Sequence, residues 1–301
     1  MLQKFNPKNE DIKIYVDGQM YHRQEAKISV YDSLAQGGDG VWEGLRVYNG
    51  KIFCLDKHID RMLFSAKALD FKGVPSREEI KSAIFQTLKV NNMHDKVHIR
   101  LTLSRGEKIT SGMDPRLNTK GCCLIVLAEH KEPVYDQIKG LRLVTASQRR
   151  NNPMFLDSKI HHNNLLNNII AKIEANFAGC DDALMLDKDG FVAETNATNI
   201  FMTKNNVLLT SHATACLNGI TRGLVIDLAR VLNIEVEQRN ISLTEFYGAD
   251  TVFTTATMGE LTPVAEIDGR SIENLSNCDI FETLNQKYKE ITQEQGEPIP
   301  N

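Results

Sequence analysis

The chain has 301 residues, of which 42% are hydrophobic and 25% are charged, and its formal net charge is −4. This composition is typical of a soluble globular protein of two domains, and it excludes the basic surface that nucleic-acid binding requires. No run of residues approaches the roughly eighteen apolar residues of a membrane-spanning helix, and the first residues lack the apolar run of a signal peptide. The six cysteines show no CxxC pair and no disulfide-like spacing. We therefore expect a cytoplasmic protein without nucleic-acid or membrane partners.

The first part of the chain combines short strands with amphipathic helices. Two hairpins are predicted, one over residues 12–21 with a turn at Asp17-Gly18 and one over residues 44–54 with a turn at Asn49-Gly50. A helix is predicted after Asp56, because apolar residues recur on one face; they are Ile59, Met62, Leu63, Ala66 and Leu69. A second helix begins at a capping box, in which Ser76 accepts from the N–H of Glu79 while the Glu79 side chain reaches back.

Residues 97–104 predict a strand with two different faces. Val97, Ile99, Leu101 and Leu103 point one way, and His98, Arg100 and Thr102 point the other. A face that carries an imidazole and a guanidinium either borders solvent or lines a polar pocket. From residue type alone the solvent-exposed face is favoured.

A further apolar strand is predicted over residues 121–129, and the polar segment 131–135 reads as a linker. We therefore expect a small α/β domain over residues 1–131 and a larger domain over residues 132–301. Strands are predicted in the second domain near residues 141–147, 183–186, 191–194, 199–203, 207–210 and 252–255. Helices are predicted near 165–177, 221–232 and 279–293. Short turns such as 187–190 join most strands, so the second domain is not a doubly wound sheet.

Three polar features follow one another in the second domain. Lys159 lies in a loop rich in amide and imidazole side chains, Glu194 ends a strand before a polar turn, and Gly219-Ile220-Thr221-Arg222 begins a helix. Each has an ordinary reading as well: a solvated lysine, a carboxylate that satisfies turn N–H groups, and a plain helix start. Together they suit pyridoxal 5'-phosphate (PLP). A lysine forms the Schiff base, a carboxylate holds the pyridinium proton, and helix N–H groups bind the phosphate.

Two neighbouring features complete this set. The small-residue turn Thr254–Gly259 offers hydroxyls and unhindered N–H groups for the other side of a phosphate. The adjacent His161 and His162 point apart and have no partner at metal-ligand spacing, so no metal site is predicted.

Six motifs in this order resemble the fold-type IV (class IV) PLP-dependent enzymes, the family of branched-chain and D-amino-acid aminotransferases. The resemblance runs from about Tyr15 to Arg270, and its motifs are Gly38–Gly44, His58–Arg61, His98–Arg100, Glu194–Phe201, Gly219–Arg222 and Thr257–Pro263. It implies a two-domain α/β fold with a small α/β domain and a larger pseudo-barrel domain. It also implies bound PLP between the domains and an obligate homodimer whose partner helps to shape the pocket.

The resemblance also implies roles for single residues. Lys159 is expected to be the catalytic Schiff-base lysine, and Glu194 the partner of the pyridine nitrogen. The cofactor-binding positions are Arg61, Glu194, Asn199, Ile220, Thr221, Thr257 and Met258, with Arg61, Ile220, Thr221 and Thr257 on the phosphate. The substrate positions are Trp42, His98 and Arg100, with Arg116 as a further candidate.

Tyrosine positions of branched-chain enzymes carry other residues here. Leu165 stands in place of the tyrosine beside the cofactor's 3'-oxygen, a role left to Asn163 or Asn164, and Gly37 and His98 replace two more tyrosines.

The expected activity is PLP-dependent transamination between an amino acid, with a branched-chain L-amino acid favoured, and a 2-oxo acid such as 2-oxoglutarate. D-amino-acid or (R)-amine transamination and aminodeoxychorismate lysis are alternatives on the same fold. A PLP-binding protein without turnover, or a structural dimer without cofactor, is the alternative from another functional class.

Overall fold

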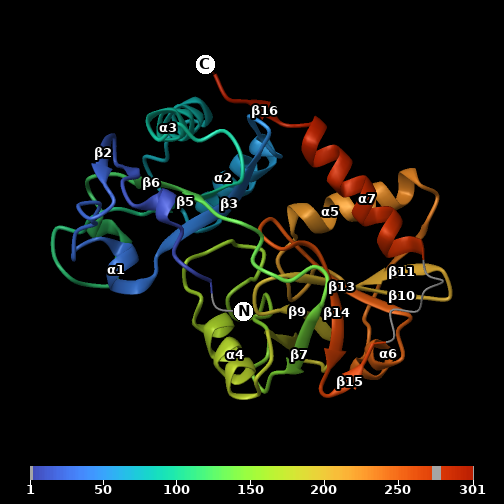
Figure 1. The fold of residues 1–301 in the computed structure, drawn as a ribbon. Helices are drawn as coiled ribbons and strands as arrows, with labels where there is room; N and C mark the ends of the chain where they lie inside the picture. The colour runs from blue at the N-terminus through green and yellow to red at the C-terminus, as the bar shows by residue number, and fades with distance from the viewer. Residues whose placement is uncertain (1–2, 273–278, 301) are drawn as a thin grey trace. The chain divides into compact units, whose positions relative to one another are not determined.

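The computed structural model describes residues 3–272 and 279–300. The chain forms two compact units (Figure 1). The N-terminal unit consists of Leu2–Glu132, Ile160–Asn164 and Thr292–Asn301, and the C-terminal unit of Pro133–Lys159 and Leu165–Ile291, with Met1 assigned to it. The division expected from the sequence had placed residues 160–164 and 292–301 in the second domain.

The N-terminal unit contains a seven-stranded antiparallel sheet with the order β16-β4-β3-β5-β6-β1-β2. Its strands are β1 (Lys13–Val16), β2 (Gln19–His22), β3 (Gly40–Tyr48), β4 (Lys51–Ile52), β5 (Val97–Ser104), β6 (Cys123–His130) and β16 (Glu297–Pro298). Its helices are α1 (Ser33–Gly37), α2 (Leu55–Ala68) and α3 (Arg77–Val90), with 3-10 turns η1 (Pro7–Asn9) and η2 (Pro115–Leu117). Both predicted hairpins, both predicted helices and the Ser76–Glu79 capping box are confirmed.

Helices α2 and α3 supply the apolar residues that pack with β3, β5 and β6 into one core. Ile59 and Met62 of α2, Ile84 of α3, and Val97 and Leu101 of β5 are fully buried in this cluster. The predicted alternation along β5 is therefore correct for its apolar side. The solvent-exposed reading of the other side is wrong for Thr102, which is buried, and His98 and Arg100 are half-buried. Their cross-strand partners, the large Arg46 and the small Gly44, belong to the same covered face.

The C-terminal unit contains a mixed nine-stranded sheet with the order β12-β11-β10-β13-β14-β7-β8-β9, and β15 pairs with β14. Its strands are β7 (Leu141–Thr145), β8 (Asp182–Leu186), β9 (Val192–Thr195), β10 (Asn199–Lys204), β11 (Val207–Thr210), β12 (Glu235–Gln238), β13 (Thr251–Ala256), β14 (Glu260–Ile267) and β15 (Arg270–Ser271). The helices are α4 (Leu166–Phe177), α5 (Ile220–Val231), α6 (Leu243–Tyr247) and α7 (Asp279–Glu294), and the last residues of α7 are assigned to the N-terminal unit.

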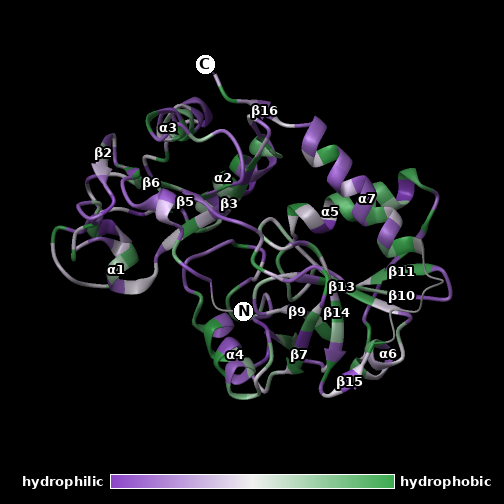
Figure 2. Ribbon diagram, in the orientation of Figure 1, coloured by the Kyte–Doolittle hydropathy of each residue, from purple (hydrophilic) through white to green (hydrophobic). Residues whose placement is uncertain are grey.

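This sheet mixes parallel pairs (β7–β8, β7–β14, β11–β12) with antiparallel ones. It is therefore not doubly wound, as predicted. Hydrophobic and hydrophilic residues both occur along α4 and α7 (Figure 2), which is usual for helices with one buried face. The predicted helices are confirmed to within one residue at each end, whereas β12 and α6 were not predicted.

A polar turn brings the two ends of this sheet together. Thr195 at the end of β9 donates its N–H to the Thr198 carbonyl, and the two hydroxyls lie 2.8 Å apart. The last strand of the sheet order thereby leads directly into the central strand β10, and the sheet curls. Glu194 and Asn199 stand on either side of this turn.

Candidate active site

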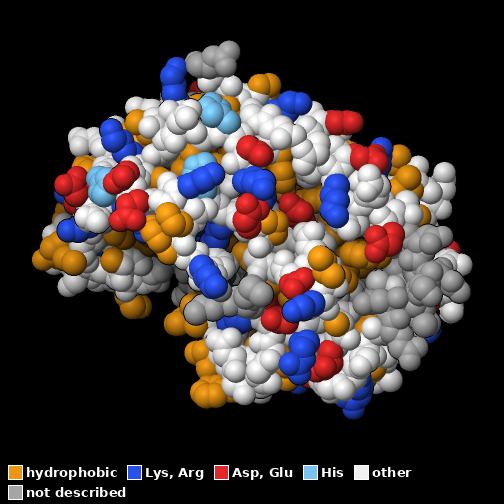
Figure 3. All heavy atoms as spheres, in the orientation of Figure 1, with side chains coloured by type: hydrophobic (Ala, Val, Ile, Leu, Met, Phe, Trp, Pro, Cys, Tyr) orange, Lys and Arg blue, Asp and Glu red, His pale blue; other side chains and the backbone are white. Residues whose placement is uncertain are grey.

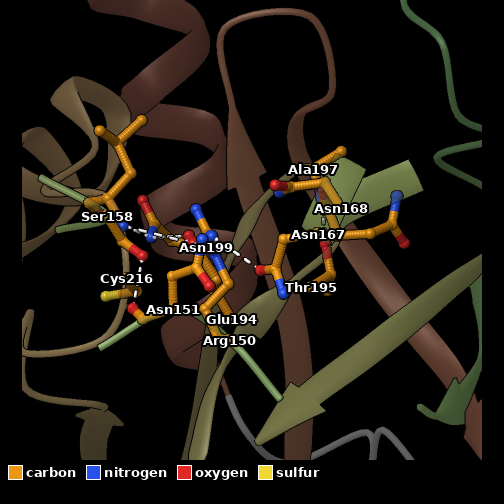
Figure 4. A network of polar contacts seen from close by, with 12 residues as sticks. Arg150, Asn151, Ser158, Asn167, Asn168, Glu194, Thr195, Ala197, Asn199 and Cys216 are labelled. Atoms are coloured by element: carbon orange, nitrogen blue, oxygen red, sulfur yellow. Dashed lines mark hydrogen bonds and ion pairs between the residues drawn. The ribbon is translucent and has the colours of Figure 1, made fainter. Parts of the chain in front are cut away.

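Glu194 is a buried carboxylate that accepts hydrogen bonds from three groups (Figure 4). Its Oε1 accepts from the Arg150 Nε at 2.6 Å and from the Leu217 N–H at 3.3 Å, and its Oε2 accepts from the Asn199 amide at 3.0 Å. Burial raises the pKa of Glu194, and the Arg150 guanidinium opposes that rise. Such a saturated donor set favours the carboxylate form, which can stabilise a protonated ring nitrogen.

Lys159 ends a loop that begins at Arg150. Its side chain is 39% exposed, and its Nζ lies 3.3 and 3.4 Å from the two oxygens of Asp157. An ion pair this exposed contributes little stability, so the amine can exchange this partner for another at small cost. The preceding Ser158 is buried and donates its hydroxyl to the Asn151 carbonyl at 2.7 Å, which ties the two ends of the loop together.

Helix α5 begins without a side-chain cap. Gly219 at its N-cap makes no side-chain hydrogen bond, and the first N–H groups of any α-helix lack partners inside the helix. The N–H groups of Ile220 and Thr221 are thus available to an anion, whose charge the helix dipole favours. A Cβ at Gly219 would stand 2.0 Å from the Asn199 Oδ1, so this close approach requires glycine.

The turn between β13 and β14 adds a second set of small polar groups. Thr257 and Met258 are half-buried there. Thr255, two residues earlier, is buried, and within residues 3–272 and 279–300 its hydroxyl has no hydrogen-bond partner. Thr255 pairs with Asn199 in the β10–β13 register, so the two side chains share one face of the sheet. A buried hydroxyl without a partner costs free energy and fits a bound polar ligand.

Arg61 of the N-terminal unit belongs to a charged cluster around Glu43, which has no exposed surface. Two N–H groups of Arg61 donate to the two Glu43 oxygens at 2.8 and 2.7 Å. His58 lies 2.7 Å and His161 3.2 Å from the same carboxylate. Burial alone would raise the pKa of Glu43, but His161 and Arg61 hold it well below its usual value. Burial lowers the pKa of His58, and that of His161 to about 4.

The predicted substrate residues of the N-terminal unit gather on one sheet face, except Arg116. The Arg100 guanidinium lies over the Trp42 ring at 3.4 Å, and the Trp42 indole donates to the His162 carbonyl at 3.1 Å. Burial lowers the pKa of Arg100 to about 10, so it remains a cation at neutral pH. Burial and nearby cations lower the pKa of His98 to about 3. Arg116 is exposed on another segment and pairs with Asp114.

Each unit therefore assembles part of the set that was expected. Glu194, Asn199, Ile220, Thr221, Thr257, Met258 and Lys159 belong to the C-terminal unit, and Trp42, Arg61, His98 and Arg100 to the N-terminal unit. Of the two amides offered for the cofactor's 3'-oxygen, Asn164 is exposed. Asn163 has a buried side-chain oxygen without a partner among the described residues.

Sequence reasoning assigned no role to Arg150, Glu43 or Thr255. Glu43 lay within a motif of the family resemblance, and Thr255 lay within the small-residue turn that was expected near the phosphate. Arg150 carried no local signal, since only its contact with Glu194 distinguishes it.

The donor set of the C-terminal unit fits PLP on three counts. It combines a saturated buried carboxylate, an uncapped helix start that excludes a Cβ, and an unpartnered buried hydroxyl among the described residues. These groups match a ring nitrogen and a phosphate, and a lysine lies in the same unit.

The sequence matches the model of the family described as amino-transferase class IV over residues 40–267. The chain belongs to this family. It is 58% identical over 98% of its length to branched-chain-amino-acid aminotransferase-like protein 2 of Arabidopsis thaliana, and it spans about half (53%) of that relative. It is 41% identical to a putative branched-chain-amino-acid aminotransferase of Methanocaldococcus jannaschii, over 95% of this chain and 98% of that one.

Solved structures of branched-chain aminotransferases share the fold. The enzyme of Thermoproteus uzoniensis, solved with norvaline, superposes with a TM-score of 0.85 and 30% identity, over 96% of this chain and 97% of that one. A thermophilic-type relative complexed with N-(5'-phosphopyridoxyl)-L-glutamate superposes with a TM-score of 0.87 and 32% identity, over 94% of this chain and 95% of that one. The predicted fold-type IV architecture is thereby confirmed. Among the described residues, none of the helices combines the length and apolarity that crossing a membrane requires.

Proposed function

We propose that this chain is a PLP-dependent aminotransferase that exchanges the amino group of a branched-chain L-amino acid with a 2-oxo acid such as 2-oxoglutarate. The observation that carries the proposal is the buried Glu194 carboxylate with its three donors, in the same unit as Lys159 and the uncapped start of α5. The similarity to branched-chain aminotransferases supports the substrate class.

PLP, when bound, supplies an aldehyde that captures the amino group and a ring that withdraws electrons. Lys159 would hold the cofactor covalently and, once released, move a proton to or from the substrate's Cα. Glu194 would hold the proton at the ring nitrogen. Arg61, Ile220, Thr221 and Thr257 would bind the phosphate with charge-assisted and helix-terminal donors.

The substrate proposal rests on Arg100. Its guanidinium is half-buried against Trp42, and no ion pair or hydrogen bond of its side chain is found in the described part of the chain. A buried cation favours an anionic partner, and a guanidinium binds a carboxylate with two parallel hydrogen bonds. The second carboxylate of 2-oxoglutarate or glutamate is such a partner. An apolar side chain would instead contact the Trp42 ring.

We further propose that the enzyme is a cytoplasmic homodimer. The five described cysteines form no disulfide, as in most proteins of reducing compartments. Helix α4 exposes an apolar stripe, made of Leu166, Ile169, Ile170, Ile173 and Phe177, and such stripes mark protein contacts.

The purified protein provides the test. It should absorb near the edge of the visible range, and borohydride should fix PLP to a peptide that contains Lys159. L-leucine with 2-oxoglutarate should be turned over faster than D-alanine or an (R)-amine, and aminodeoxychorismate should release no pyruvate. Lys159→Ala should lose both trapping and turnover. Labelling of Lys172 instead, or turnover of D-alanine alone, would contradict the proposal.

A further inference from the structure

Arg150 is a buried arginine that the roles assigned so far leave unused. Its side chain is 7% exposed, and that of its ion-pair partner Glu194 is 6% exposed. The Arg150 Nη1 also donates to the Asn167 Oδ1 at 3.1 Å. The Asn167 amide is fixed in turn, because its Nδ2 donates to the Arg149 carbonyl at 2.8 Å. Two elements, the loop before Lys159 and the first turn of α4, thus hold the guanidinium in one orientation against the carboxylate (Figure 4).

The surroundings of Glu194 show why this cation matters. Apart from Arg150, the carboxylate meets the Asn199 amide and the Leu217 N–H, which are neutral. The neighbouring Cys216 thiol stays neutral as well, because burial raises its pKa to about 12. Arg222 is the remaining cation with an influence on Glu194, and its guanidinium donates to Ser211 and Gln238. Without Arg150, a carboxyl group this buried would favour its neutral form.

We propose that Arg150 is a positioning residue that keeps Glu194 ionised and correctly oriented, so that Glu194 can stabilise a protonated ring nitrogen. This inference rests on the proposed PLP function. It assigns Arg150 no contact with the cofactor. A protonated Glu194 would occupy its own oxygen with a proton and could no longer neutralise a cationic ring.

The test measures PLP affinity of the PLP-free full chain, by titration with PLP and visible absorbance. Four proteins are compared: the parent, Arg150→Gln, Arg150→Lys and the control Arg149→Gln. Arg149 is the adjacent arginine, but its side chain donates only to backbone carbonyls. Each Arg150 variant is also made in a Glu194→Gln background, which completes a double-mutant cycle. Circular dichroism reports whether each variant folds.

We expect Arg150→Gln to weaken PLP binding roughly tenfold to a hundredfold at pH 7, since each unit of pKa shift at Glu194 corresponds to about a factor of ten. The loss should shrink as the pH rises from about 6 to about 9 and Glu194 ionises again. It should largely vanish in the Glu194→Gln background. Arg150→Lys should recover part of the affinity, and Arg149→Gln should bind PLP as the parent does.

Equal losses in both backgrounds and at every pH would overturn the inference, because they would show a merely structural role. If Arg150→Gln does not fold, the Arg150→Lys pair gives the same comparison with a smaller expected loss. A parent protein that binds no PLP would overturn the proposed function and the inference with it. PLP binding that is insensitive to Arg150 would overturn the inference alone.

Discussion

Arg61 is held at Glu43 by two N–H groups, so its guanidinium has a fixed orientation before any ligand binds. Preorganised charged donors lose little entropy when they bind an anion. If Arg61 binds the PLP phosphate, Arg61→Ala should weaken PLP binding by about 1–3 kcal/mol, or roughly tenfold to a hundredfold. Equilibrium dialysis measures this loss. Arg77→Ala is the matched control, because Arg77 pairs only with surface carboxylates of the same unit. Unchanged retention by Arg61→Ala would exclude the role.

Arg100 should discriminate between the two half-reactions. A dual-specificity aminotransferase binds an apolar side chain in one half-reaction and a second carboxylate in the other. Because a guanidinium gains most from a carboxylate, Arg100→Ala should slow the half-reaction with glutamate by roughly tenfold or more relative to that with leucine. Single-turnover rates with each amino acid measure this ratio. Equal losses would mean that Arg100 holds the α-carboxylate or is structural, and Arg116 would become the next residue to test.

His161 should make the N-terminal unit sensitive to acid. Its folded-state pKa of about 4 lies below the usual value of 6.5, so between these values the unfolded chain binds a proton that the folded chain does not. Stability is therefore retained above pH 6.5 and lost as the pH falls toward 4, by about 2 kcal/mol at about pH 5. Urea unfolding at about pH 7 and about pH 5 measures the difference.

His161→Gln should remove this pH-dependent loss, whereas His94→Gln, at an exposed histidine of the same unit, should leave it in place. A loss of equal size in His161→Gln and the parent would show that another group titrates.

Helix α5 offers two glycines with opposite expectations. A Cβ at Gly219 would meet the Asn199 Oδ1 at 2.0 Å, whereas a Cβ at Gly223 would meet nothing within 4 Å. Gly219→Ala should therefore displace the amide that donates to Glu194 and destabilise the protein by about 1–3 kcal/mol. Gly223→Ala should stabilise it by about 0.5–1 kcal/mol, because alanine is the better helix former. Thermal unfolding of both variants measures the contrast, and equal effects would show that the close approach at Gly219 is not maintained.

At the level of elements, periodicity predicted most of the fold. The α2 and α3 faces, the β5 alternation and the Ser76 capping box are local patterns, and local patterns survive folding. The short β12 and α6 escaped because four or five residues carry too little periodicity.

The site was less predictable, for a physical reason. Arg150 follows Arg149 in the sequence, and nothing local distinguishes the buried cation from its neighbour; only the distant Glu194 does so. Likewise, Arg61 on a helix reads as a surface charge until the buried Glu43 of β3 is placed against it. Resemblance to a family supplied such residue roles, and pattern alone did not.

For the whole molecule, the apolar stripe of α4 predicts self-association. Its five residues are between 45% and 89% exposed, and hydrophobic side chains reach the surface at the position of α4 (Figure 3). The 33.9 kDa chain should sediment at about twice that mass. Ile173→Glu should shift it toward the monomer, because a charge in an apolar interface loses its water.

Val231→Glu, at an exposed apolar residue at the end of α5, is the control and should leave the mass unchanged. A monomeric parent protein would exclude the proposed dimer.

The contact between Arg100 and Trp42 has an optical consequence. Trp42 is the only tryptophan of the 301 residues, and it lies against both the Arg100 guanidinium and the His161 ring. Indole emission is sensitive to charge and polarity near the ring. Any carboxylate that draws Arg100 away from the indole therefore changes the environment of the sole strong fluorophore. The chain thus carries its own reporter of substrate binding, which needs no label and functions before any chemistry takes place.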